Sequence, residues 1–488
     1  MRCGRPQRGG GEAVRAIAKS LGWALLVSNA LTVGIVPRAF AQDNAPAGAE
    51  GGAPSGGGEI APTGEYKEGL PLAGWMLFPS AFLGAVYNSN LSQAAQGTPT
   101  ENGFGVRAVP RLVGTYDGGI YKTMVYGVVD GDFYHDNASN TNFFDNNTLS
   151  ASAGFSNIYE ATRELLFSVY GNYTRERDIF NSALNFNNGA IGPAGGVLGP
   201  AGAPGGSIPI IINPFGTTPS VNPIPFNQFT GGGSVTATSG QGFATLGGTA
   251  FYILYDESPD NVPVPFQTSL NGASIWVTGK VGYHIVPGFY LFAEGDGIFQ
   301  RFNNSLFDTN GYRVLGGMGW DDPKSLFRGE IYGGYQAQFQ DLNGVNIPPG
   351  LGVPPGTTTS PVFGGRISYF PTPYWTVIAQ VDETLGVSTF LSTTVPAGAP
   401  SLVTTAILQT TYGIAREWSV GVRGGYTRAE FFGISDVQNG WLAGASFNYE
   451  IWRNLLLTLD YQYTNVRSNV AAQSFMTNMA SAGLTYRY

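Results

Sequence analysis

The feature that most constrains this chain is a strict alternation of apolar and polar side chains over many segments of 10–15 residues. In residues 327–340 the odd-numbered positions are apolar, aromatic or small, and the even-numbered ones are mainly Arg, Glu, Gln and Tyr. Residues 454–464 repeat the pattern, with Leu456 as the exception. A period of two predicts β-strands. An apolar face this regular is typical of strands with lipid on one side and water on the other.

The composition agrees with a strand-based membrane protein. Charged residues make up only 12% of the 488 residues, about half of what a soluble domain usually carries. No run of 18 consecutive apolar residues follows the N-terminal region. Because only helices and closed barrels satisfy every backbone amide in lipid, a membrane location requires a closed barrel. Composition alone also leaves open a soluble β-sandwich array or β-solenoid.

The N-terminus predicts export. A basic segment with Arg2, Arg5, Arg8, Arg15 and Lys19 precedes an apolar run at 21–36, and Ala39-Phe40-Ala41 follows as a small-x-small cleavage site. This order is typical of a secretory signal peptide over residues 1–41. The alternative, a membrane anchor, needs about 20 apolar residues. Cleavage after Ala41 changes the net charge from −8 to −13 and removes Cys3, the one cysteine.

Residues 42–72 are rich in Ala, Gly and Pro. They contain too few apolar side chains to offset the entropy of ordering, so we expect a flexible periplasmic leader.

Residues 73–488 then form the expected barrel. Short turns such as 117–119 and 287–288 alternate with long polar or Gly/Pro-rich loops, as in barrels whose short turns lie in the periplasm.

Counting segments between these turns and loops predicts an all-β, transmembrane, antiparallel up-and-down barrel of about 16 strands. The first strand is expected at 76–90 and the last at 475–488. The longest expected loop covers about 181–271, and its residues 181–255 contain no Asp, Glu, Lys or Arg. A loop of this length is usually functional or disordered, and a lumenal plug or constriction is one interpretation. If residues 242–255 instead form a strand, the count becomes 18.

The C-terminus ends in alternating apolar and polar residues. Gly483, Tyr486 and Tyr488 fall at the spacing Gly-x-x-aromatic-x-aromatic. This spacing resembles the signal read by the machinery that inserts barrels into the outer membrane. We therefore expect these three residues to act as an insertion signal.

The first part of the expected barrel carries short motifs. Phe78-Pro79-Ser80 is followed by residues 86–90 (VYNSN), then by Val109-Pro110-Arg111-Leu112 and a turn at 117–119. This run resembles the bacterial families described as putative β-barrel porins, best over about 76–180. The resemblance implies a membrane barrel and no defined substrate.

The polar face of the expected strands carries a near-balanced set of charges, which we interpret as pore-lining. Charges that line a pore set its ion preference through their fields, so a balanced set predicts weak selectivity or opposed patches. The alternative is that these charges pair across the wall and fill it. The predicted pore-lining residues are Arg107, Arg111, Lys122, Lys280, Glu294, Asp296, Arg328, Glu330, Arg366, Asp382, Arg423 and Asp460.

The sequence offers little for catalysis or cofactors. The only histidines are His135 and His284, and neither shares a strand face with a suitably placed Ser or carboxylate, so we expect no enzyme. Residues 136–147 are oxygen-rich but lack the spacing of a calcium loop. We therefore predict no catalytic, metal or cofactor site. With a net charge of −13 and no basic run after cleavage, nucleic acid is not an expected partner.

These observations favour a pore in the outer membrane of a Gram-negative bacterium, through which small hydrophilic solutes diffuse passively, because barrels of 16–18 strands leave an aqueous channel. The expected partners are outer-membrane lipid, lipopolysaccharide, the insertion machinery and the solutes. The alternative is a plugged structural or binding barrel that supports surface polysaccharide export or adhesion. The sequence identifies neither the solute nor the oligomeric state.

Overall fold

A computed structural model describes residues 69–91, 93–94, 96–136, 148–176, 225–256, 271–303, 305, 308–322, 325–340, 356–372, 374–387, 400–432, 437–469 and 474–488. The expected signal peptide, and the expected leader up to residue 68, lie outside these ranges. Within the described ranges the chain forms strands joined by turns, and no helix there is long and apolar enough to cross a membrane.

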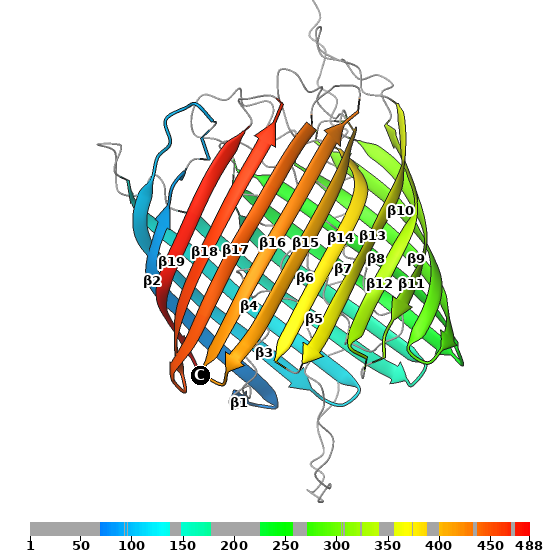
Figure 1. The fold of residues 1–488 in the computed structure, drawn as a ribbon. Helices are drawn as coiled ribbons and strands as arrows, with labels where there is room; N and C mark the ends of the chain where they lie inside the picture. The colour runs from blue at the N-terminus through cyan, green and yellow to red at the C-terminus, as the bar shows by residue number, and fades with distance from the viewer. Residues whose placement is uncertain are drawn as a thin grey trace, which may run out of the picture. The chain divides into compact units, whose positions relative to one another are not determined.

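Eighteen strands, β2 to β19, form one antiparallel barrel in which each strand pairs with its neighbours along the chain (Figure 1). The barrel closes where β19 pairs with β2, from Met479 opposite Asn88 to Arg487 opposite Ser80. The strands are β2 (Trp75–Asn88), β3 (Gly103–Asp117), β4 (Tyr121–Asp136), β5 (Thr148–Thr162), β6 (Leu165–Glu176), β7 (Phe226–Ser239), β8 (Gly242–Tyr255), β9 (Gly272–Val286), β10 (Phe289–Phe302), β11 (Thr309–Trp320), β12 (Phe327–Gln340), β13 (Thr357–Thr372), β14 (Trp375–Val387), β15 (Pro400–Ala415), β16 (Trp418–Phe431), β17 (Val437–Trp452), β18 (Leu455–Ser468) and β19 (Phe475–Arg487).

The expected barrel architecture is confirmed, and the strand count of 18 replaces the preferred count of 16. The two additional strands are β7 and β8, which form a hairpin inside the segment expected to be a loop at 181–271. β8 is the strand expected at 242–255 in the alternative count of 18, whereas β7 was missed. The alternation is weak in β7 because its inward positions carry mainly Ser, Thr, Gly and Gln rather than charges, while several outward positions are Gly or Ala. The rest of that expected loop, including any plug, lies outside the described residues.

A three-residue strand, β1 (Leu70–Leu72), corrects the expected end of the leader. It pairs with the start of β2, with Leu70 opposite Leu77 and Leu72 opposite Trp75. Ala73 and Gly74 make the tight turn between them, both with positive φ. The last residues of the expected leader are therefore ordered against the turn end of the barrel.

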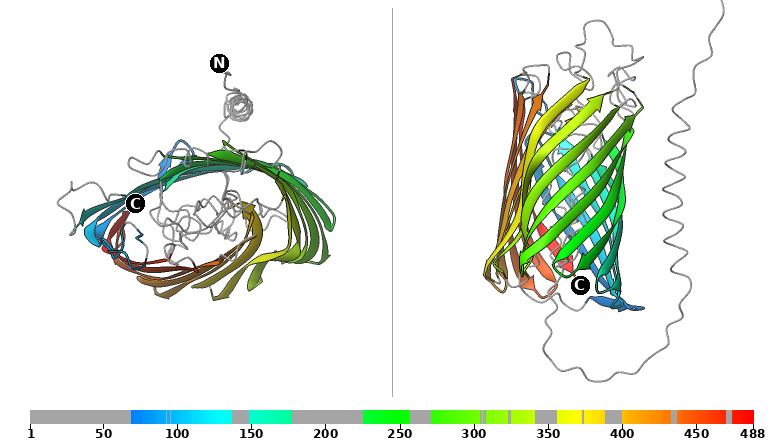
Figure 2. Two further views of the ribbon diagram at one scale, coloured as in Figure 1. Left: turned by 90° about the horizontal axis from the view of Figure 1, so that it is seen from above. Right: turned by 90° about the vertical axis from the view of Figure 1, so that its right-hand side faces the viewer.

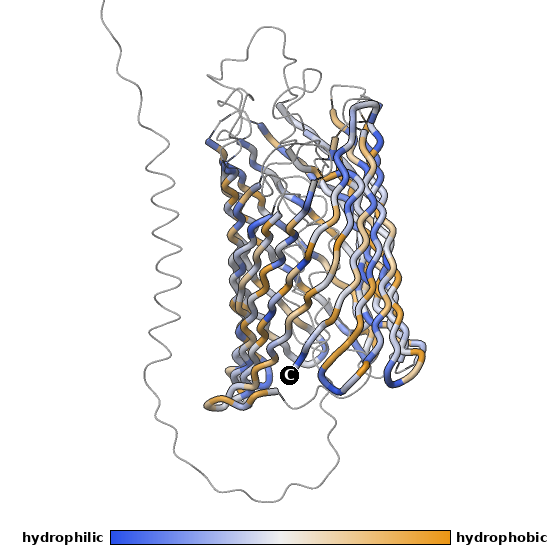
Figure 3. The backbone as a smooth tube through the Cα atoms, turned by 90° about the vertical axis from the view of Figure 1, so that its left-hand side faces the viewer, coloured by the Kyte–Doolittle hydropathy of each residue, from blue (hydrophilic) through white to orange (hydrophobic). Residues whose placement is uncertain are grey.

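The two faces of the wall differ as the alternation predicts, and Figure 3 shows the apolar and polar residues alternating along the strands. Leu83 and Val281, on outward positions, are 62% and 58% exposed. Buried polar and charged residues such as Ser168, Thr278 and Arg313 occupy the inward positions. Lipid contact explains the exposed apolar face, because every backbone group within a paired strand is already satisfied.

Two aromatic girdles mark the edges of the apolar face. Near the short turns, outward rings pack in pairs, including Tyr121 with Tyr159 at 4.6 Å and Phe327 with Tyr369 at 4.4 Å between ring centroids. Near the opposite strand ends, Tyr426 packs on Trp441 at 4.3 Å. Amphipathic rings of this kind favour the membrane–water interface.

Candidate functional site

All twelve residues predicted to line a pore lie on the inner face of the wall. The cross-strand register fixes this, because directly paired residues share a face and the pairs follow the inner positions from strand to strand. Lys280 lies opposite Glu294, Asp296 lies opposite Arg313, and Glu330 lies opposite Arg366. His135 lies opposite Phe104, on the outer face.

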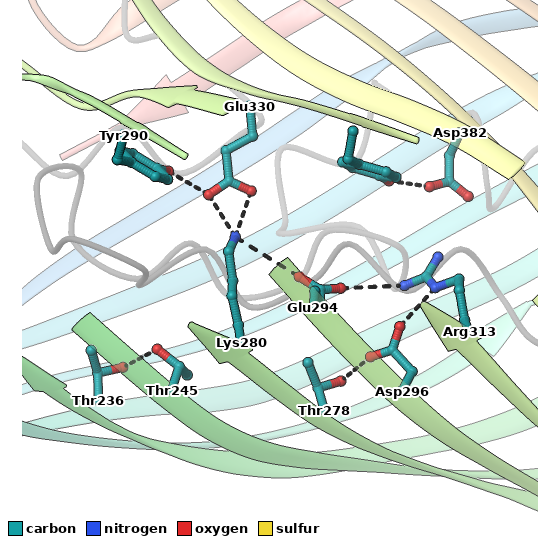
Figure 4. A network of polar contacts seen from close by, with 11 residues as sticks. Thr236, Thr245, Thr278, Lys280, Tyr290, Glu294, Asp296, Arg313, Glu330 and Asp382 are labelled. Carbon is teal, nitrogen blue, oxygen red and sulfur yellow. Dashed lines mark hydrogen bonds and ion pairs between the residues drawn. The ribbon is translucent and has the colours of Figure 1, made fainter. Parts of the chain in front are cut away.

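The densest group of inner charges is defined as the β9–β14 network (Figure 4). Its members come from β9 to β12 and from β14, and β13 contributes none. They are Thr278 and Lys280 on β9, Tyr290, Glu294 and Asp296 on β10, Arg313 on β11, Glu330 and Tyr332 on β12, and Asp382 on β14.

Lys280 is the hub of one half of the network. Its Nζ lies 2.7 Å from Glu330 Oε1, 3.8 Å from Glu294 Oε2 and 3.9 Å from the centre of the Phe292 ring. Tyr290 Oη donates a hydrogen bond to Glu330. The Lys280 side chain is only 3% exposed, and a buried cation of this kind requires such partners.

Arg313 is the hub of the other half and was not among the predicted residues. Its Nε lies 2.7 Å from Asp296 Oδ2, and its Nη2 lies 3.6 Å from Glu294 Oε1. Thr278 Oγ1 donates to Asp296 at 2.6 Å. The outward neighbours Tyr312 and Val314 are the signal by which alternation assigns Arg313 to the inner face.

Tyr332 joins the network to β14 by passing over β13. Its hydroxyl donates to Asp382, and the residue beneath its ring is Gly364. A Cβ at Gly364 would lie 2.5 Å from Tyr332 Oη. Glycine at this position therefore allows the β12 side chain to reach β14.

Two further pairs lie on the other side of the barrel. Arg107 contacts Asp130, with Nη2 2.5 Å from Oδ2, and Asp132, with Nε 3.6 Å from Oδ1. Arg423 binds Asp460 through two nitrogens, at 2.7 and 2.8 Å. Most of the predicted charges are thus paired with a charge of the opposite sign on the wall. The electric field in the lumen therefore comes from groups of both signs rather than from one unpaired charge.

The remaining predicted residues differ in their surroundings. Lys122 makes an exposed pair with Glu160 at 3.2 Å near the turn end. Arg328 stacks on Phe370 at 4.9 Å. Arg366 forms no ion pair within the described part of the chain, because Glu330, which lies opposite, binds Lys280 and Tyr290 instead. Arg111 faces inward opposite Val128.

Sites for other chemistry do not emerge from the described residues. No group of three or more His, Cys, Asp or Glu side chains there could hold a metal ion. His284 lies at the turn end, with Nε2 3.0 Å from Asp321 Oδ2. Gly483 faces inward opposite Gly84, while Tyr486 and Tyr488 are exposed; their role as an insertion signal stays a prediction.

The family is decided by a match of residues 213–488 to the model of a family described as "Putative beta-barrel porin 2". The chain belongs to this family. The predicted family is confirmed, but the match covers the C-terminal part of the chain rather than 76–180, where the resemblance was expected to be best. Membership places the protein in the outer membrane as a porin-like barrel.

Solved structures of porins match the chain at low sequence identity and low TM-score. A BenF-like porin from Pseudomonas fluorescens Pf-5 shares 10% identity, with 85% of this chain and 99% of that chain covered and a TM-score of 0.41. OccAB4 from Acinetobacter baumannii shares 10% identity, with 84% and 98% covered and a TM-score of 0.39. No curated protein matches the chain.

Proposed function

We propose that the protein is a channel through which small hydrophilic solutes diffuse passively across the outer membrane. The observation that supports this proposal most is the inner wall, where charged and hydroxyl side chains occupy inward positions from β3 through β18 while the outward positions are apolar. An 18-stranded barrel is wide enough for an aqueous lumen. Membership in a porin family supports the same reading.

The paired charges favour weak ion selectivity. The β9–β14 network holds four carboxylates and two cations, so its field attracts small cations. Arg328 on β12 and Arg366 on β13 lie beside the network, and their positive charges oppose that preference. When charges of both signs line one pore, their fields oppose each other, and the pore does not exclude either cations or anions.

Liposome swelling tests the proposal. Liposomes that contain the folded protein should swell in isosmotic solutions of uncharged sugars, faster for a pentose than for a trisaccharide, because a water-filled lumen sieves by size. Liposomes with the heat-unfolded protein are the control. Equal, background swelling for all sugars would contradict the proposal.

A second candidate is a binding barrel with a restricted lumen. Phe226, Ile253 and Val466 occupy inward positions toward the loop end, yet each is at most 1% exposed. An open, water-filled lumen would leave such apolar side chains wetted, at a cost of roughly 25 cal/mol per Å². This candidate predicts background swelling for every sugar, together with saturable binding of a surface glycan to the folded protein.

A further inference from the structure

One seam of the barrel wall is paired over only part of its length. The β13–β14 ladder runs from Thr372 opposite Trp375 to Gly364 opposite Asp382 and stops there. Beyond it, residues 357–363 pair only with β12, and residues 383–387 pair only with β15. At about 3.3 Å per residue the unpaired edge of β13 is roughly 20 Å long. The view from above in Figure 2 shows the loop-side ends of β14 and β15 curving into the barrel.

The unpaired end of β14 is held inside by a side chain of β12. Gln336 Nε2 donates to the carbonyl of Leu385 at 3.0 Å, and Gln336 Oε1 accepts from the amide of Leu385 at 3.1 Å. Gln336 Oε1 also accepts from Thr384 Oγ1 at 3.0 Å. The side-chain amide thus takes the place of a neighbouring strand at Leu385.

The sequence of β13 fits an open edge at the same position. Continuing the β13–β14 register would bring Pro361 opposite Leu385. The β12–β13 rungs alternate, and Gln340 donates to the carbonyl of Gly356, so the nitrogen of Pro361 points away from β12. Proline cannot donate to a ladder and is confined to edges. Pro361 therefore could not donate to the Leu385 carbonyl, as Gln336 Nε2 does.

The base of the seam is anchored and its flanks are uncharged apart from Glu383. Tyr332 holds Asp382 at the last rung. Phe363, on the outer side of β13, is 49% exposed, and Val362 and Leu385 are buried. The same alternation that orients Pro361 directs the backbone amides of Thr357, Thr359 and Phe363 toward the seam. The seam therefore combines apolar side chains with free-edge hydrogen-bond donors.

We propose that this seam is a lateral portal between the lumen and the membrane for single-chain amphiphiles with an acceptor headgroup, such as alkyl carboxylates. An open sheet edge is unfavourable in hydrocarbon, and an acceptor headgroup satisfies the amides of Thr357 and Thr359 while an alkyl chain lies along Phe363. The proposal rests on the proposed channel, because the portal needs a lumen that solutes enter.

A disulfide that cross-links β13 and β14 across the seam tests the proposal. Phe363→Cys with Glu383→Cys adds the next rung after Gly364–Asp382, in a Cys3→Ser background. The matched control is Thr410→Cys with Val422→Cys, a directly opposed outward pair in the intact β15–β16 ladder, away from the seam. Both are placed in nanodiscs, oxidised or reduced, and photolabelled with dodecanoate carrying a diazirine on its chain.

The portal predicts labelling at Val362 and Leu385 that excess dodecanoate competes away and that falls about tenfold on oxidation of the seam pair but not of the control. Labelling that oxidation leaves unchanged, or that is confined to the outer face of all strands, would overturn it. In the wild-type protein, dodecanoate should also slow amide exchange at Thr357, Thr359 and Phe363, and unchanged exchange contradicts the portal. Potassium conductance of the locked protein reports on the channel separately.

Discussion

Gln336 and Leu385 are bound to each other through both backbone polar atoms of Leu385, although β13 lies between their strands. A side-chain amide here does what a paired strand does elsewhere in the wall. The contact holds the end of β14 inside the barrel, and it coincides with the one proline of β13 that would face Leu385 in a continued ladder.

Replacing Gln336 should loosen the end of β14. Gln336→Leu leaves the Leu385 amide and carbonyl without this partner, at a cost of roughly 2–4 kcal/mol in the free energy of unfolding. Urea titration, read as the folded fraction on unheated gels, measures the change. Gln338→Leu is the control, because Gln338 makes a single side-chain bond, to Thr309, and should cost about 1 kcal/mol. Equal losses in the two variants would contradict the role of Gln336.

Moving the proline by one residue should show which edge of β13 is paired and which is open. Pro361→Ala should change stability by less than about 1 kcal/mol, because its nitrogen faces the open edge. Pro361→Ala combined with Val362→Pro should cost about 3 kcal/mol or more, because the amide at residue 362 points to β12 and a ladder bond is lost. The same titration compares them. Similar stability for the two variants would place the open edge elsewhere.

Removing the buried hub cation should alter both stability and selectivity. Lys280→Met leaves Glu330 without its cation and Glu294 with Arg313 alone. Breaking a buried pair costs about 3–5 kcal/mol, and the lost positive charge shifts the reversal potential in a KCl gradient toward cation preference. Lys122→Met is the control, since the Lys122–Glu160 pair is exposed and worth at most about 1 kcal/mol. A reversal potential that does not move for Lys280→Met would show that the network does not face the ion path.

A charge placed on either face of the wall tests the assignment of lipid and lumen. Val281→Arg puts a cation on the outward face of β9 and should cost roughly 2–4 kcal/mol near the midplane, seen as a lower folding yield into bilayers. Thr411→Arg, at a half-buried inner position of β15 opposite Thr376, should fold normally and change conductance instead. A normal yield for Val281→Arg would argue against lipid contact there.

The sequence predicted the barrel and its inner face well because strand parity is a strong signal where charges are present. Glu330 and Arg366, for example, follow from alternation alone. The signal fails in β7, where inward residues such as Ser234 and Thr236 differ little in polarity from outward Gly and Ala residues.

The contacts within the inner wall could not be predicted, because they join strands through register and side-chain reach. Lys280 and Glu330 are 50 residues apart and meet across β10 and β11. The partly open seam likewise depends on where β14 leaves β13. A proline such as Pro361 is typical of an unpaired strand edge, but it does not identify one, because prolines also occur in paired strands, as Pro110 does opposite Ala81.

Planar-bilayer recording of the purified, folded protein tests the central account most directly. A porin-like channel predicts discrete conductance steps in KCl, with a small reversal potential in a gradient that Lys280→Met shifts toward cations. A correctly folded protein that inserts into the bilayer and gives no conductance over many insertions would contradict a diffusion channel and favour the binding barrel.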